Sequence, residues 1–119
     1  MLAAGCSDYS IKIWNTQHFI LQETIYNHQQ PVNAIVISKD NTKLISASND
    51  SHIFVTSMKD FSNLADMKGH VGPVTSLDIT DDCQLLVSGG HDEIVRIWAL
   101  NGYICLFTLL GNTDSIIQV

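Results

Sequence analysis

The chain has 119 residues, of which 45% are hydrophobic and 15% are charged, and its net charge is −6 at pH 7. This length and apolar content predict a domain with a packed core and exclude a disordered chain. Only six lysine and arginine residues are present, and they are scattered, so no nucleic-acid partner and no membrane surface is expected. No apolar run approaches the ~20 residues of a membrane helix, and no signal peptide is recognisable. A cytoplasmic location is therefore expected, with the nucleus as the alternative.

Short runs of strand type follow one another along the chain, separated by polar turns. No segment keeps a 3.6-residue apolar period over the length of a helix, although residues 61–67 could be argued as a short one. The runs equivalent to 61–67 are of strand type, so the whole chain is predicted to be all-β. In chain order, strands are expected at residues 1–5, 11–14, 19–25, 32–38, 43–48, 53–56, 61–67, 74–80, 84–88, 94–98, 103–110 and 115–119.

The chain repeats itself at a constant interval. The spacing from Asp8 to Asp50 equals that from Asp50 to Asp92, and the neighbouring positions agree without a gap. Trp14 has the same register as Trp98. Agreement at many positions indicates a tandem repeat, with a small antiparallel sheet of four short strands in each complete unit.

The third unit resembles a WD40 repeat through Gly69-His70, Ser88, Asp92 and Trp98. Ala99 follows the tryptophan where the family has aspartate, and the second unit departs further. It has Asn27-His28 for Gly-His and Thr56 for the tryptophan. The resemblance implies a β-propeller whose blades are four-stranded antiparallel sheets. About three blades in an incomplete ring are expected: 1–27 as an incomplete blade, 28–69 and 70–111 as complete blades, and 112–119 as the first strand of a further one.

The resemblance also implies a hydrogen-bonded tetrad of His70, Ser88, Asp92 and Trp98 that ties three strands of one blade together. An aspartate can hold the imidazole in one tautomer, and a buried indole needs an acceptor, which the serine oxygen can supply. The corresponding residues of the other units, expected to form shorter networks, are His28, Ser46 and Asp50 in the second and Asp8 and Trp14 in the first.

Catalytic and metal sites are both disfavoured. Ser, His and Asp are also the members of a hydrolase triad, but the same trio recurs in the second unit, as structural parts do. His70, His91 and Asp92 do not have the spacing of a common metal site. Neither a catalytic residue nor a metal or cofactor is therefore expected. The three cysteines, Cys6, Cys83 and Cys105, are expected to be reduced and buried.

In the family that the chain resembles, partners commonly dock on one face of the propeller. The resemblance places seven residues there: Ser7, Pro31, Asn33, Asn49, Pro73, Thr75 and His91. They carry no fixed charge, which predicts a protein or peptide partner recognised by hydrogen bonds and shape. The expected function is a non-catalytic scaffold for protein–protein interaction. The alternative is a regulatory or sensor module of a larger multidomain signalling protein.

Both ends of the chain fall inside expected blades. Residues 1–5 correspond to a second strand, and residues 115–119 to a first strand. Two explanations stay open. The chain is part of a longer WD-repeat protein, or copies self-associate through their incomplete blades, residues 115–119 of one copy completing the first blade of another.

Overall fold

The computed structural model describes residues 1–109, which form eleven β-strands and no helix, so no helix of this part of the chain could cross a membrane. The all-β prediction is confirmed. The strands, in chain order, are β1 (Leu2–Gly5), β2 (Ile11–Asn15), β3 (Ile20–Ile25), β4 (Val32–Ile37), β5 (Lys43–Ser48), β6 (Ile53–Ser57), β7 (Asn63–Met67), β8 (Val74–Ile79), β9 (Leu85–Gly90), β10 (Val95–Ala99) and β11 (Ile104–Leu109).

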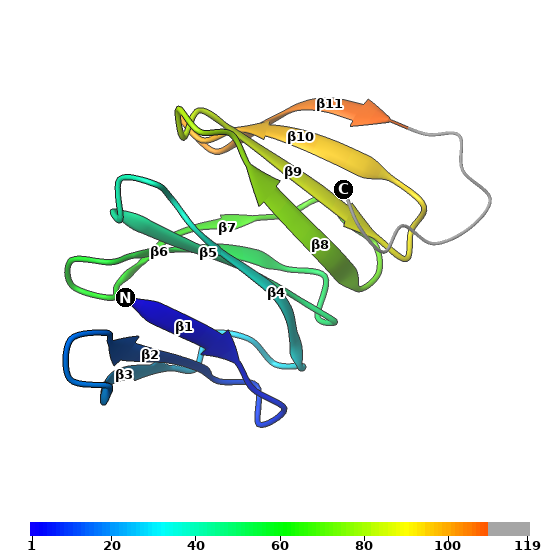
Figure 1. Cartoon of the computed structure of the whole chain (residues 1–119). Coiled ribbons are helices and arrows are strands. Elements are labelled where there is room, and N and C mark those ends of the chain that lie inside the picture. Colours follow the sequence, from blue (N-terminus) through cyan, green and yellow to red (C-terminus); the bar gives the residue numbers. More distant parts are fainter. Residues whose placement is uncertain (110–119) are drawn as a thin grey trace.

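The strands form three antiparallel sheets that are stacked side by side (Figure 1). Sheet 1 has the order β1-β2-β3, sheet 2 has β4-β5-β6-β7, and sheet 3 has β8-β9-β10-β11. Each strand pairs with its neighbour in sequence, so all connections within a sheet are hairpins. The described sheets do not close into a ring, as Figure 1 shows.

The core lies between the sheets, and sheet 2 contributes to it from both faces. Successive side chains of a strand point to opposite faces. Leu44 therefore packs on sheet 1, with Ile11 and Ile13, while Ile45 packs on sheet 3, with Leu86 and other buried side chains. All five of these side chains are fully buried. The alternation of apolar residues thus sets the order in which the sheets stack.

Three aromatic residues, each expected to begin a strand, lie instead in the preceding turn. Phe19, Phe61 and Tyr103 have φ angles of 54°, 60° and 56°, and the strands begin after them. A residue in the left-handed region changes the direction of the chain, so it cannot continue the hydrogen-bonded pairing of a β-strand. Such a conformation costs about 1–3 kcal/mol and persists where packing enforces it. Phe61 and Tyr103 each pack on the cluster shared with the preceding sheet.

The cysteines are free, and all three are half-buried rather than buried as expected. Cys83 lies in the turn after β8 with a φ angle of 60°, which brings its side chain to the surface of a hairpin. The expected first strand of a further unit, residues 112–119, lies outside the described residues.

Candidate functional site

In sheet 3, four side chains that are far apart in the sequence lie within hydrogen-bonding distance of one another. His70 Nδ1 is 2.8 Å from Asp92 Oδ2, and its Nε2 is 2.7 Å from Ser88 Oγ. The indole N–H of Trp98 donates to the same Ser88 oxygen at 2.9 Å. Ser88 therefore donates its own proton to the imidazole, and Nδ1–H donates to the carboxylate. The network joins β9 and β10 to the loop before β8, so it ties two strands and a loop rather than three strands.

Burial decides the charge state of this network. Burial lowers the pKa of His70, against the opposing effect of the Asp92 carboxylate beside it. Burial alone would raise the pKa of Asp92, but hydrogen bonds from His70 and from the Val71 and Ile94 amides outweigh it and hold the pKa below its ordinary value. A neutral imidazole between an ionised aspartate and a serine is the state in which every proton has an acceptor.

Sheet 2 repeats the histidine, serine and aspartate but not the tryptophan. His28 Nδ1 is 2.9 Å from Asp50 Oδ2, and its Nε2 is 2.8 Å from Ser46 Oγ. The ring of Phe54 contacts His28 edge-on, with 4.8 Å between the ring centroids. Burial lowers the pKa of His28 as it does that of His70. Thr56, at the position of Trp98, is fully buried, and its hydroxyl has no hydrogen-bond partner.

Asn27 precedes His28 but forms no side-chain hydrogen bond with this network. It stands at the position of Gly69, where a Cβ would lie 3.3 Å from Trp98 Cη2. A side chain at position 69 would therefore crowd the indole, whereas sheet 2 has the smaller Thr56 at the position of Trp98. Both polar atoms of the Asn27 side chain are buried without a partner. In the sequence, this difference is visible as two changes between the units, from Gly69 to Asn27 and from Trp98 to Thr56.

In sheet 1, Asp8 and Trp14 have neither the hydrogen-bond partners of their equivalents in sheet 3 nor a hydrogen bond with each other. Asp8 Oδ1 accepts hydrogen bonds from the amide and hydroxyl of Ser10, and Oδ2 lies 3.4 Å from Lys12 Nζ. The hydrogen bonds from Ser10 lower the pKa of Asp8. Trp14 lies on the neighbouring strand β2, paired with Leu2 and Leu21, and is half-buried. The structure therefore does not join this pair in a network like that of sheet 3.

The seven residues expected to contact a partner lie at one end of the strands. Three are exposed in the equivalent turns after β1, β5 and β9: Ser7, Asn49 and His91. The other four lie just before β4 and β8 or at their starts: Pro31, Asn33, Pro73 and Thr75. Of these, Asn33 is exposed and the others are half-buried. We call this set the turn face; it follows the same side of all three sheets (Figure 1).

Hydrogen bonds fix the backbone of the turn face. The amide of Asn49 donates to the carbonyl of Pro31 at 3.1 Å, and the amide of His91 donates to that of Pro73 at 2.9 Å. Asn33 Nδ2 donates to Asn49 Oδ1 at 2.7 Å and to the carbonyl of Val74, in the next sheet, at 2.9 Å. The turn face is thus rigid, and Asn33 links two sheets.

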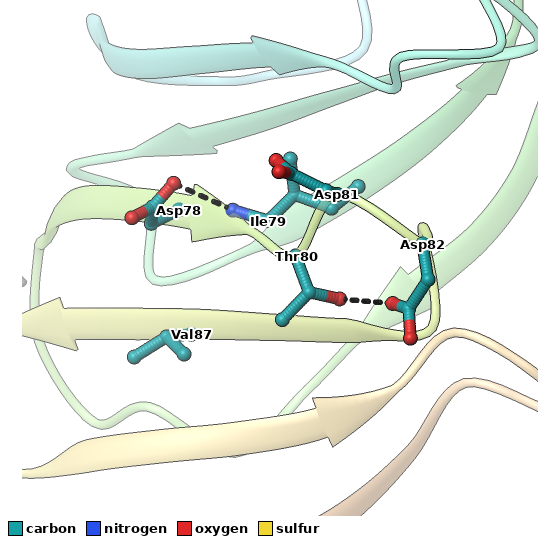
Figure 2. A pocket seen from close by; sticks show the side chains of 6 residues that line it. All are labelled: Asp78, Ile79, Thr80, Asp81, Asp82 and Val87. Carbon is teal, nitrogen blue, oxygen red and sulfur yellow. Dashed lines mark hydrogen bonds between the residues drawn. The ribbon is translucent and has the colours of Figure 1, made fainter.

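A hollow of about 460 Å³ lies on sheet 3, at the opposite ends of its strands (Figure 2). Asp78, Asp81 and Asp82 line it together with Thr80, whose hydroxyl donates to Asp82 at 2.6 Å. Within residues 1–109, no three His, Cys, Asp or Glu side chains are placed to hold a metal ion. The carboxylates of Asp78 and Asp82 accept hydrogen bonds from their own strand end and turn, and Asp81 Oδ1 lies 3.1 Å from Lys39 Nζ.

The arrangement of Ser88, His70 and Asp92 has the order of a hydrolase triad, yet its surroundings differ from those of a nucleophile. Ser88 has no exposed surface. Its oxygen already accepts the indole N–H of Trp98. A nucleophilic hydroxyl needs access to a substrate, and burial denies this access to Ser88.

Comparisons with known proteins agree with this geometry. The family model described as "WD domain, G-beta repeat" matches residues 19–57 and 61–99. Nuclear distribution protein nudF of Aspergillus niger is 33% identical over 111 residues, which are 88% of this chain and 25% of that protein. Transducin beta-like protein 3 of Rattus norvegicus is 32% identical, over 87% of this chain and 13% of that protein.

Similarity extends to a further relative and to a solved structure. Pre-mRNA-processing factor 19 of Caenorhabditis elegans is 31% identical, over 82% of this chain and 19% of that protein. A structure described as "Structure of U3-55K" superposes with a TM-score of 0.93 at 23% identity, over 98% of this chain and 37% of that one. The chain thus spans a quarter or less of the length of these three relatives.

Proposed function

The chain belongs to the WD40-repeat family, and on that premise we propose that it is a non-catalytic scaffold that binds a protein or peptide through the turn face. Proteins of this family typically act as scaffolds for protein interaction. The observation that carries the proposal is the combination of exposed side chains with a fixed backbone. Ser7, Asn49 and His91 are exposed in equivalent turns, and the last two are anchored to proline carbonyls. Fixed loops lose little entropy on binding.

The chemistry of the turn face indicates how the partner is recognised. Amide, hydroxyl and imidazole groups dominate it, so hydrogen bonds and shape select the partner, and salt has little effect on binding. Relatives named for nuclear distribution and for pre-mRNA processing support a cytoplasmic or nuclear setting.

The same proposal assigns a structural role to both His-Ser-Asp sets. Their aspartates hold the loop before β4 or β8 by accepting its backbone amide, Gln29 to Asp50 at 2.9 Å and Val71 to Asp92 at 3.2 Å. These loops lead directly into Pro31 and Pro73. The two networks therefore hold in place the loops that carry Pro31 and Pro73 into the turn face. No reaction is assigned to Ser88.

The test compares variants at the two ends of the strands. Partners are first captured with the unmodified chain, and their affinities are then measured for Asn49→Glu/His91→Glu and for Lys59→Glu/Asn101→Glu, whose positions are turns at the opposite end. A hot spot at the centre of an interface contributes about 2 kcal/mol or more, so the turn-face variant should bind at least about tenfold more weakly. The control variant should bind as the unmodified chain does. Equal losses in both, or no loss at the turn face, contradict the proposal.

A further inference from the structure

The turn between β10 and β11 contains the dipeptide Asn101-Gly102. Among the asparagines of the sequence, only Asn101 is followed by glycine. A backbone amide nitrogen that follows an asparagine can attack the carbonyl carbon of that side chain, and glycine hinders the attack least because it has no Cβ. Asn101 and Gly102 are both exposed, and Gly102 has a φ angle of 89°. The two reacting groups are therefore open to water.

The equivalent turn of sheet 1 has a side-chain acceptor for its backbone amides, whereas this turn of sheet 3 has none. Asn15 Oδ1 accepts the amide of Gln17 at 2.8 Å and that of His18, the equivalent of Gly102, at 3.3 Å. Ala99 occupies the position of Asn15 in sheet 3. A methyl group accepts no hydrogen bond, so the Gly102 amide lacks the bond that His18 makes.

The exposure of this turn does not depend on what adjoins sheet 3. Sheet 2 is packed on both faces, yet Lys59 and Asp60, the equivalents of Asn101 and Gly102, are exposed. Sheet 2 also keeps an acceptor in this turn, because Ser57 Oγ accepts the amide of Lys59 at 3.1 Å. The missing acceptor is thus a local property of the turn in sheet 3.

Two other asparagines are exposed in turns, and the amide that follows each of them is already bonded. The amide after Asn41 donates to Asp40 Oδ1 at 3.0 Å, and the amide after Asn49 donates to Ser48 Oγ at 3.1 Å. Attack on either asparagine would first break such a bond, and the attacking residue would carry a side chain. Asn101 differs from both in these two respects.

We propose that Asn101 is a deamidation site, at which the Gly102 amide nitrogen attacks because it has no side-chain acceptor to hold its proton. The nitrogen loses its proton to a base in solution and bonds to Asn101 Cγ. The Cγ–Nδ2 bond breaks, and ammonia leaves after it regains a proton from water. A second water molecule then opens the resulting succinimide at either of its carbonyls, which yields aspartate or isoaspartate.

The product adds a carboxylate to a hollow of about 420 Å³ between sheets 2 and 3. Lys43 and Tyr103 line this hollow with Asn101, and Lys43 Nζ lies 5.5 Å from the centre of the Tyr103 ring. Among the described residues that line it, Lys43 alone is charged at neutral pH. The hollow lies at the opposite end of the strands from the turn face, so binding of a partner there should not change.

Mass spectrometry of peptides tests the proposal after incubation of the folded 119-residue chain at mildly alkaline pH. Replacement of the side-chain NH₂ by OH adds about 1 Da, and this gain is expected at Asn101 but not at Asn41 or Asn49. The modified chain is one unit more negative than −6, so it also separates on anion exchange. Asn101→Gln should abolish that form, because its longer side chain must close a larger ring.

Substitutions of Ala99 test the cause. Ala99→Asp and Ala99→Asn each supply an acceptor as Asn15 does, so both should slow the reaction about two- to tenfold, the factor that corresponds to one net hydrogen bond. Ala99→Val, which supplies none, is the matched control and should react as the unmodified chain does. Circular dichroism establishes that each variant is folded.

Three results overturn the proposal. The first is a folded, unmodified chain that gains no mass at Asn101. The second is equal modification of Asn101, Asn41 and Asn49 in that chain. The third is one common rate for the folded Asp, Asn and Val variants of Ala99, because the missing acceptor would then have no part in the reaction.

Discussion

At the scale of single residues, Asp92 and Asp50 hold their histidines alike, but the networks beyond the histidines differ. His70 positions Ser88, which in turn is the acceptor for Trp98, while the chain from His28 ends at Ser46. Asp92→Ala should therefore lower the free energy of unfolding more, by about 3 kcal/mol against about 2 kcal/mol for Asp50→Ala. Urea unfolding measures both. Equal losses in the two variants contradict this ranking.

The buried histidines also determine how stability depends on pH. Burial lowers the pKa values of His28 and His70, so the unfolded chain binds their protons more readily than the folded chain. Their contribution is complete above the ordinary pKa of 6.5 and is lost as the pH falls below it. The lowered pKa values of Asp50 and Asp92 add a second loss below 3.8. The melting temperature should fall in two phases on acidification.

Replacement of one histidine checks the assignment of the first phase. His70→Gln should lower the melting temperature at pH 7.5 and also flatten its decline between pH 6.5 and pH 5, because one proton-linked group is lost. A decline of unchanged steepness shows that other groups are responsible. Thermal unfolding followed by circular dichroism at closely spaced pH values gives both quantities.

The resemblance to WD40 repeats was enough to predict that His70, Ser88 and Asp92 lie near one another, as they do in the structure. The environment of Asn27 was not predictable in this way, because it depends on the volume left by Thr56, which lies on a different strand. The sequence shows that Thr56 is smaller than the tryptophan at the equivalent position 98. It does not show which side chain lies next to Thr56, because that depends on the path of the loop backbone.

At the scale of the strand and its loop, positions 27 and 56 should be coupled. Thr56→Trp alone should destabilise the chain by about 1–3 kcal/mol, because the indole overlaps the space of Asn27. The double change Asn27→Gly/Thr56→Trp should be more stable than either single variant, since Ser46 then receives an indole N–H as Ser88 does. A double-mutant cycle measures the coupling. Additive effects of the two changes contradict it.

The strands themselves were largely predictable, while several of their ends were not. Runs of strand type between polar turns, together with the register of the repeat, located all eleven described strands. The starts at Phe19, Phe61 and Tyr103 were wrong because aromatic residues favour strands on average, whereas all three close the preceding turn at positive φ, Phe19 without packing on a preceding sheet. This geometry belongs to the turn as a unit, and the strand propensity of a single residue does not contain it.

At the scale of the whole molecule, a stack of sheets contacts only its neighbours, so the cost of a cavity depends on whether a neighbour is present. The regular period of the repeat predicted that sheets 1, 2 and 3 pack on one another in chain order, because each sheet has two apolar faces to bury. The repeat does not predict what covers the outer faces of sheets 1 and 3. Similar substitutions on an inner and an outer sheet therefore measure the contribution of a neighbour.

Ile53 and Ile97 provide that comparison, because each lies on the face of its sheet that points away from the preceding sheet. Ile53 is fully buried between sheets 2 and 3, whereas Ile97 on sheet 3 is half-buried. Ile53→Ala should cost about 2–5 kcal/mol, the usual range for a core cavity, and Ile97→Ala less than about 2 kcal/mol in dilute solution. Chemical unfolding of both variants measures the two costs, and equal costs contradict a contribution from the neighbouring sheet.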